Sequence, residues 1–154
     1  MKKEGSSDTR IKNLMMFFNL LHSYETVCRP VCHRLNISQT ALDILMFLCE
    51  NPEYATAKDV SRFRAMKPNI VSFNVERLVE EGYLERSEVP GDRRKIRLSC
   101  TDKAREAVRE GREISERFYK DITEGIKKEE LEMFENCLKR IEDNAEHIRN
   151  RNQP

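Results

Sequence analysis

Cysteine is the first residue type in this chain that could do chemistry, because a thiolate is both a nucleophile and a metal ligand. Cys28 and Cys32 lie four residues apart, and His33 follows them, so a helix would place the two thiols on one face. Two ligands do not complete a zinc site, and free cysteine is more often a small buried hydrophobe. The pair is therefore a candidate for thiol or metal sensing, with core packing as the favoured interpretation. The same interpretation applies to Cys49, Cys100 and Cys137, which fall on apolar periods.

Catalytic chemistry has little support elsewhere in the chain. The three histidines are scattered at His22, His33 and His147, and we find no glycine-rich phosphate loop, nucleophile elbow or zinc-protease motif. Acidic pairs such as Glu80-Glu81 are typical of solvated helix faces. We therefore expect that the chain is not an enzyme and needs no cofactor.

Positive charge concentrates in the middle of the chain. The segment from Thr56 to Arg105 carries twelve Lys and Arg against eight Asp and Glu, a net charge of +4, although the whole chain has only +1. A local field, and not the total charge, is what attracts a polyanion. Within the segment, Arg93, Arg94 and Lys95 follow Asp92 directly, and the narrow minor groove of DNA would attract such guanidinium groups. The middle segment therefore favours nucleic-acid binding.

A helix over residues 68–81 would present a second set of polar side chains. Its apolar residues Val71, Val75 and Leu78 form one buried face, which turns five others outward: Asn69, Ser72, Phe73, Glu76 and Arg77. The first two turns of such a helix reach base edges in a major groove. We expect Asn69 and Ser72 to contact bases and Phe73 a thymine methyl group, while Lys67 and Arg77 contact phosphates.

Neighbouring signals place this helix in a helix-turn-helix with a hairpin. Thr56 and Asp59 have capping-box spacing and open a short helix through Phe63. Pro68 favours the start of the next helix, and Gly82 its end. The apolar period then changes from 3.6 to 2, which predicts strands over 83–89 and 96–100 with a turn at Pro90-Gly91.

Longer helices are predicted on both sides of this segment. After residues 1–9, which are polar and expected to be disordered, a helix from Ile11 reaches Cys32, with a kink or break near 27–29 caused by Pro30. A second helix runs from Ser38, its N-cap, to Asn51-Pro52. Thr101 caps a long helix, and a last helix follows Gly125, with an apolar seam from Leu131 to Ile148.

The two terminal helices carry more apolar surface than one chain can cover. Four successive apolar residues, Met15 to Phe18, cannot all face one side of a helix, and the 131–148 seam also needs a long partner. We therefore predict a homodimer, whose two-fold symmetry would match a pseudo-palindromic DNA site. The apolar run Leu14 to Leu21 is too short to cross a membrane and lacks a signal-cleavage site, so a cytoplasmic location is expected.

The segment from Thr56 to Thr101 contains a specific set of motifs: Leu78, Glu81-Gly82-Tyr83-Leu84, Arg86, Asp92-Arg93-Arg94 and Leu98-Ser99-Cys100-Thr101. With these motifs, the segment resembles the MarR family of winged helix-turn-helix transcriptional regulators. The order of the flanking helices extends the likeness to about residues 10–149. Three positions depart from the family pattern: Ala104 replaces the usual glycine, Cys100 precedes the capping threonine, and Pro30 lies in the first helix.

The resemblance implies a mainly α fold with a small β-hairpin wing, an α+β architecture. It implies one domain over 10–152, with dimerisation helices at about 10–36 and 104–149 and a winged helix-turn-helix lobe at about 38–103. In such a protein Arg94 would enter the minor groove, with Asp92 fixing its pose, and the function would be that of a repressor on double-stranded DNA.

The resemblance also implies a pocket between the lobes for small effectors, often aromatic or phenolic. Phe18, His22, Met46 and Phe47 are the candidates to line it, although core packing is the favoured interpretation of these four. Two alternatives to a ligand-controlled repressor stay open at this point. One is a thiol- or metal-responsive regulator, and the other is a winged-helix module that binds a protein, for which the outward Phe73 and Glu76 give some support.

Overall fold

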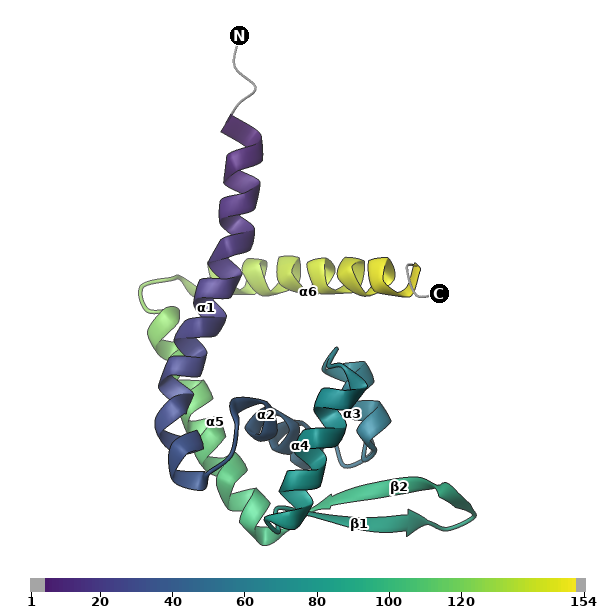
Figure 1. Ribbon diagram of the computed structural model, residues 1–154. Coiled ribbons are helices and arrows are strands. Elements are labelled where there is room, and N and C mark those ends of the chain that lie inside the picture. The colour runs from purple at the N-terminus through teal and green to yellow at the C-terminus, as the bar shows by residue number, and fades with distance from the viewer. Residues whose placement is uncertain (1–4, 152–154) are drawn as a thin grey trace. The chain divides into compact units, whose positions relative to one another are not determined.

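The computed structural model describes residues 5–151, and for residues 5–11, 13, 14, 93 and 94 it describes the backbone alone. The elements in chain order are α1 (Gly5–Leu35), α2 (Gln39–Glu50), α3 (Ala57–Phe63), α4 (Pro68–Glu80), β1 (Leu84–Val89), β2 (Asp92–Cys100), α5 (Asp102–Ile122) and α6 (Lys128–Arg151). The two strands form an antiparallel hairpin between α4 and α5 (Figure 1). The predicted fold class, mainly α with a small hairpin wing, is confirmed.

Contacts divide the chain into two units, one that ends at Phe118 and one that begins at Tyr119. The first unit holds α1 to β2 and most of α5, and the second holds the end of α5 and all of α6. Among residues 5–151, no helix has the length and apolar composition needed to span a membrane.

Helix α1 corrects two expectations. The helix begins at Gly5, inside the segment 1–9 that we expected to be disordered, and residues 1–4 lie outside the description. It also continues through Pro30 to Leu35, so a break near 27–29, one of the two predicted effects of the proline, is wrong, and the kink stays a prediction. Cys28, Val31 and Cys32 are buried on both sides of the proline. Their packing offsets the backbone hydrogen bond that proline removes.

The short helices begin where their capping residues predict. Ser38 Oγ accepts a hydrogen bond of 3.0 Å from the Ala41 amide at the start of α2. At α3, the Asp59 amide donates to Thr56 Oγ1 and the Thr56 amide donates to Asp59 Oδ2, both at 3.1 Å, so the predicted capping box is confirmed. Pro68 is the first residue of α4.

The core of the first unit lies where α2 meets the helix-turn-helix, the hairpin root and α5. Leu42, Ile44 and Leu45 of α2 are wholly buried at its centre. Around them lie the buried residues Val60, Val71, Val75, Leu78, Tyr83, Leu84, Leu98, Ala104, Ala107 and Val108. Gly111 lets α5 approach closely, since a Cβ there would lie 3.3 Å from Leu42 Cδ1. This core fixes the orientation of α4.

The hairpin has a regular root and an irregular tip. Leu84 pairs with Cys100 and Arg86 with Leu98 at the root, while near the tip the partners of Glu88 and Val89 jump from Ile96 to Asp92. The Leu98 amide also donates to the Ala55 carbonyl at 2.7 Å, which attaches β2 to the loop before α3. The hairpin is thus anchored to the helix-turn-helix at its root.

Candidate nucleic-acid interface

Helix α4 presents the predicted face to solvent. Val71, Val75 and Leu78 are at most 3% exposed, while the five residues predicted to point outward are all exposed: Asn69, Ser72, Phe73, Glu76 and Arg77. The side chain of Phe73 is 62% exposed, an unusual position for so large an apolar group. The predicted orientation of α4 is confirmed, and the assignment of Asn69 and Ser72 to bases stays a prediction. Lys67, the N-cap of α4, is also exposed.

A buried polar residue that the sequence did not reveal positions α4. Asn74 is 7% exposed and lies within the apolar face. Ser38 Oγ donates to Asn74 Oδ1 at 2.8 Å, and Asn74 Nδ2 donates to the Ile70 carbonyl at 2.8 Å. Because Ser38 also caps α2, this contact links the start of α2 to the middle of α4. An amide next to Val75 on the apolar face was the signal that could have revealed it.

Two acidic side chains near α4 form ion pairs with arginines. Glu76 Oε2 accepts from Arg86 Nη2 at 3.0 Å, and this contact with the guanidinium lowers the pKa of Glu76. The outward Glu76 therefore binds β1 of the hairpin, which accounts for an acidic residue on this face. Arg77, predicted to contact phosphate, lies 3.2 Å from Glu81, and its side chain stays 47% exposed.

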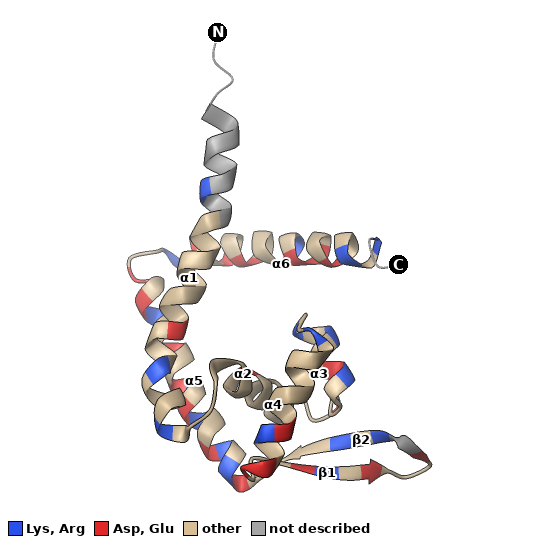
Figure 2. Ribbon diagram, in the orientation of Figure 1, with Lys and Arg blue, Asp and Glu red and all other residues tan. Residues whose placement is uncertain are grey.

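The basic cluster of the hairpin lies at its tip. Residues 93–95 fall in the register shift, and the side chains of Lys95 and Asp92 are exposed. The predicted roles of Arg93 and Arg94 lie outside the described side chains. Figure 2 shows Lys and Arg along β2, and Arg97 Nη2 donates to the Pro52 carbonyl at 3.2 Å. The hairpin thus adds exposed positive charge beside the helix-turn-helix.

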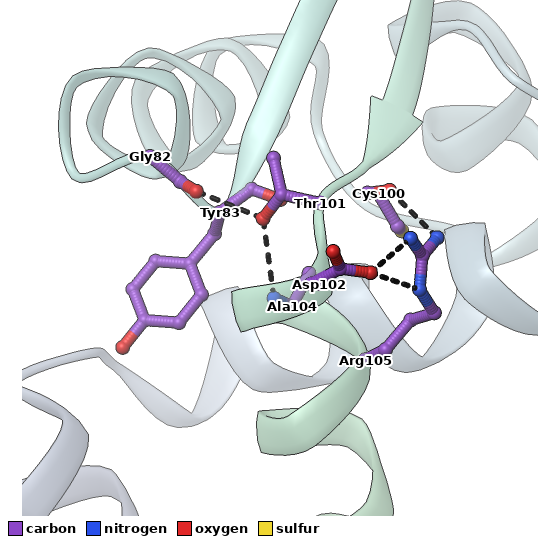
Figure 3. Close-up of polar contacts among 7 residues, drawn as sticks. All are labelled: Gly82, Tyr83, Cys100, Thr101, Asp102, Ala104 and Arg105. Atoms are coloured by element: carbon purple, nitrogen blue, oxygen red, sulfur yellow. Dashed lines mark hydrogen bonds and ion pairs between the residues drawn. The ribbon is translucent and has the colours of Figure 1, made fainter.

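The hairpin root is joined to the start of α5 by a small polar network (Figure 3). Thr101 Oγ1 accepts from the Ala104 amide at 3.3 Å, which confirms Thr101 as a cap, and donates to the Gly82 carbonyl at 2.8 Å. Gly82 has φ of +75°, the left-handed conformation that glycine adopts most easily. Tyr83 Oη donates to the Leu35 carbonyl at 3.1 Å, so α1 is connected to the same root.

The four effector-pocket candidates occupy different environments. Phe18 is 59% exposed, and His22 is exposed with its Nδ1 3.8 Å from Glu25. Phe47 stacks on Phe63 with ring centroids 6.1 Å apart, and half-buried Met46 faces Gly111. Three cavities of about 400, 360 and 230 Å³ in the described part of the chain are lined by other residues. The role of the four candidate residues in effector binding stays a prediction.

The first cysteine pair is packed into the core. Cys28 and Cys32 are both buried, and burial raises the pKa of each thiol, that of Cys32 to about 11. Cys32 Sγ donates to Gln39 Oε1 at 3.5 Å. Among the described residues, no three His, Cys, Asp or Glu side chains are grouped as a metal site requires. The structure therefore favours the packing interpretation that the sequence suggested.

The sequence and the fold of this chain are similar to those of known proteins. Residues 35–95 match the model of the MarR family. A MarR protein from Peptoclostridium difficile superimposes with a TM-score of 0.82 at 19% identity, covering 96% of this chain and 93% of that one. A MarR-family regulator from Listeria monocytogenes complexed with a 26mer DNA gives 0.79 at 15% identity, over 85% and 87% of the chains.

A third solved structure contains a ligand. The organohalide-sensing regulator RdhR in its 2,4-dichlorophenol-bound form gives a TM-score of 0.74 at 21% identity, over 94% of this chain and 85% of that one. The winged helix-turn-helix thus matches the family model directly, and the fold is shared with solved MarR regulators over nearly the whole chain. Residues 35–95 therefore carry the MarR family signature, within a fold that is shared with solved MarR proteins.

Proposed function

We propose that this protein binds double-stranded DNA sequence-specifically as a homodimer and represses transcription from a pseudo-palindromic site. Helix α4 would enter the major groove, where Asn69 and Ser72 contact base edges and Phe73 a thymine methyl group. The hairpin tip, with Arg93, Arg94 and Lys95, would reach the neighbouring minor groove.

The exposed face of α4 is the observation that carries the proposal. Its amide, hydroxyl and aromatic side chains point away from a closed core, and Asn74 fixes the helix against α2. The fold similarity to the Listeria regulator complexed with DNA supports the same use of this face. The contact between Glu76 and Arg86 gives Glu76 an internal role, which weakens the case for a protein-binding module.

Homodimer formation is supported by apolar side chains on the terminal helices. On α1, Met15, Met16, Phe18 and Leu21 are each at least half exposed, and none of the residues of α6 is buried. Monomeric soluble proteins rarely expose contiguous apolar faces of this kind. A second copy of the chain would cover them, and its α4 would occupy the second half-site.

Control by a small aromatic effector is the last part of the proposal. It rests on the fold similarity to a regulator with bound 2,4-dichlorophenol. An effector must bind the DNA-competent and DNA-incompetent states with different affinities in order to act. Adding 2,4-dichlorophenol to the protein–DNA complex tests this directly, since an unchanged DNA affinity would remove such phenols from the proposal.

A selection of bound duplexes from a random pool, followed by anisotropy titrations at several salt concentrations, tests DNA binding. We expect an enriched palindrome and a second, weaker affinity for random duplexes that falls steeply with salt. Lys67→Gln should weaken binding to all sequences and reduce the salt slope by about one. Lys128→Gln, at the exposed start of α6, is the matched control and should change neither quantity. No binding at low salt would reject the proposal and leave the protein-binding module.

A further inference from the structure

A second pair of thiols lies where α2 ends and the hairpin joins α5. Cys49 is the next-to-last residue of α2 and Cys100 is the last residue of β2, and both are free and half-buried. Although far apart in sequence, the two side chains are hydrogen-bonded, with the Cys100 thiol donating to Cys49 sulfur. Both line a cavity of about 230 Å³, so the pair is open to small molecules.

Two guanidinium groups lie beside this pair. Arg105 Nη1 donates to the Cys100 carbonyl at 3.1 Å and its other nitrogens bind Asp102 (Figure 3). Arg112 Nε donates to Glu50 Oε1 at 2.8 Å. Both arginines line a second cavity, of about 400 Å³, that also reaches Cys49. Glu113 and Glu116 line the same cavity, so Cys49 is accessible and lies among paired arginine and glutamate side chains, of which Arg105 and Arg112 favour its ionised form.

The surroundings shift the pKa values of the two thiols in opposite directions. The hydrogen bond from Cys100, aided by Arg105 and Arg112, lowers the pKa of Cys49 against the opposing effects of burial and Glu50. The pKa of Cys100 is raised by the contact with Cys49 and by burial. Of the two thiols, Cys49 is therefore the one that ionises more easily. Cys28 and Cys32 differ, because burial raises the pKa of both.

We propose that Cys49 and Cys100 form a peroxide-reactive dithiol, in which Cys49 is the nucleophile and Cys100 the resolving thiol. This inference goes beyond DNA binding and does not depend on it. The oxidant is hydrogen peroxide or an organic hydroperoxide, a molecule small enough for either cavity.

The reaction has two balanced steps. Cys49 thiolate attacks one peroxide oxygen, so that an S–O bond forms, the O–O bond breaks, and the leaving hydroxide or alkoxide takes up a proton as water or alcohol. Cys100 sulfur then attacks Cys49 sulfur, forming the S–S bond as the hydroxyl group leaves with the Cys100 proton as water. In total, two thiols are oxidised by two electrons and one peroxide is reduced.

Disulfide formation would change the hairpin root. An S–S bond of about 2.05 Å is far shorter than a hydrogen-bonded contact between two sulfur atoms, so the ends of α2 and β2 must approach each other. The root is already attached to the loop before α3 through Leu98 and Ala55. The oxidised pair would therefore alter how the hairpin sits on the helix-turn-helix.

The test uses the full chain with Cys137→Ser, which removes the exposed thiol on α6. One equivalent of hydrogen peroxide is added to the reduced protein, and intact-mass and peptide analysis follow. We expect the loss of two hydrogen atoms and a crosslinked peptide joining Cys49 to Cys100. With Cys100→Ser added, we expect a sulfenic acid on Cys49 that dimedone traps.

Matched variants make the test decisive. Cys28→Ser with Cys32→Ser should leave the crosslink unchanged, whereas Cys49→Ser should abolish it while circular dichroism shows the same fold. A crosslink between Cys28 and Cys32, a dimedone adduct on another cysteine, or an unmodified reduced protein would each overturn the proposal.

Discussion

The winged helix-turn-helix and the terminal helices are built from similar amphipathic helices, yet they differ in how their apolar faces are covered. In the former, Leu42, Leu45 and Leu78 are at most 1% exposed within one chain. In α6, Met133 is 69% and Phe134 55% exposed, and every described side chain is at least partly open to solvent. One region thus completes its core within the chain, while the other leaves apolar side chains exposed, as the proposed dimer requires.

The polar contacts differ in the same way. Ser38, Asn74 and Tyr83 form hydrogen bonds between elements of the first unit that are distant in sequence. The contacts described for α6 are nearer in sequence, such as Lys128 with Glu132 at 3.8 Å and Tyr119 Oη with Glu135 at 2.7 Å. Such exposed local contacts stabilise a helix without fixing its tertiary position.

Truncation of the closed core should have the largest effect. Leu45→Ala removes a wholly buried side chain and should lower the free energy of unfolding by about 2–5 kcal/mol. Urea denaturation followed by circular dichroism measures it. Ile126→Ala, at a residue 46% exposed between α5 and α6, should cost less than about 0.5 kcal/mol. Equal losses for the two variants would contradict the difference between the regions.

A charge placed on the α6 seam should break the proposed dimer. Phe134→Glu would bury a carboxylate in an apolar interface and should weaken dimerisation by about 2–4 kcal/mol. Light scattering during size-exclusion chromatography measures the dimer fraction. Asn136→Glu adds the same charge on the opposite face of α6 and should leave the dimer intact. A wild-type protein that is monomeric, or a Phe134→Glu variant that stays dimeric, would argue against this interface.

Changing a proposed base contact should have a smaller effect, confined to DNA. Asn69→Ala should cost about 1–3 kcal/mol on the selected site and relax specificity at one base pair, without lowering the free energy of unfolding. Titration against a set of single-base variants of that site measures it. Asn144→Ala, exposed on α6, is the control. A uniform loss across all sequences would instead identify Asn69 as a phosphate contact.

A half-buried carboxylate in the first unit should give the smallest effect. Burial raises the pKa of Asp43, opposed by the hydrogen bond from Gln39 and by Arg64. Because the folded-state pKa lies above the unfolded one, the ionised group destabilises the fold at neutral pH, and this cost disappears as pH falls through the folded pKa. Asp43→Asn should therefore raise the free energy of unfolding slightly at neutral pH, with no gain in acid. A gain in the free energy of unfolding that is independent of pH would instead indicate an effect of side-chain packing.

Most of the first unit could be predicted from local patterns. Ser38, Thr56, Pro68 and Thr101 are at the helix starts that their capping preferences indicated, and the change of period after Gly82 located the hairpin. The break at Pro30 was predicted wrongly because local propensity cannot weigh the packing of neighbouring buried side chains.

Contacts between distant elements could not be predicted in the same way. Asn74 bonds to Ser38, Glu76 to Arg86, and Cys49 to Cys100, in each case across a sequence separation that no periodicity reports. The sequence alone offered Cys28 and Cys32 as the candidate sensing pair, because they are close in sequence, although it favoured core packing for both. The structure buries that pair and brings two other thiols together beside arginines.

The sequence by itself determined where the helices and strands begin, which face of α4 is apolar, and which residue types face outward, because capping and periodicity are local properties. Only the tertiary structure decided which polar groups become partners and which thiols become accessible. These depend on desolvation and on distances between elements, and both arise when the elements pack together.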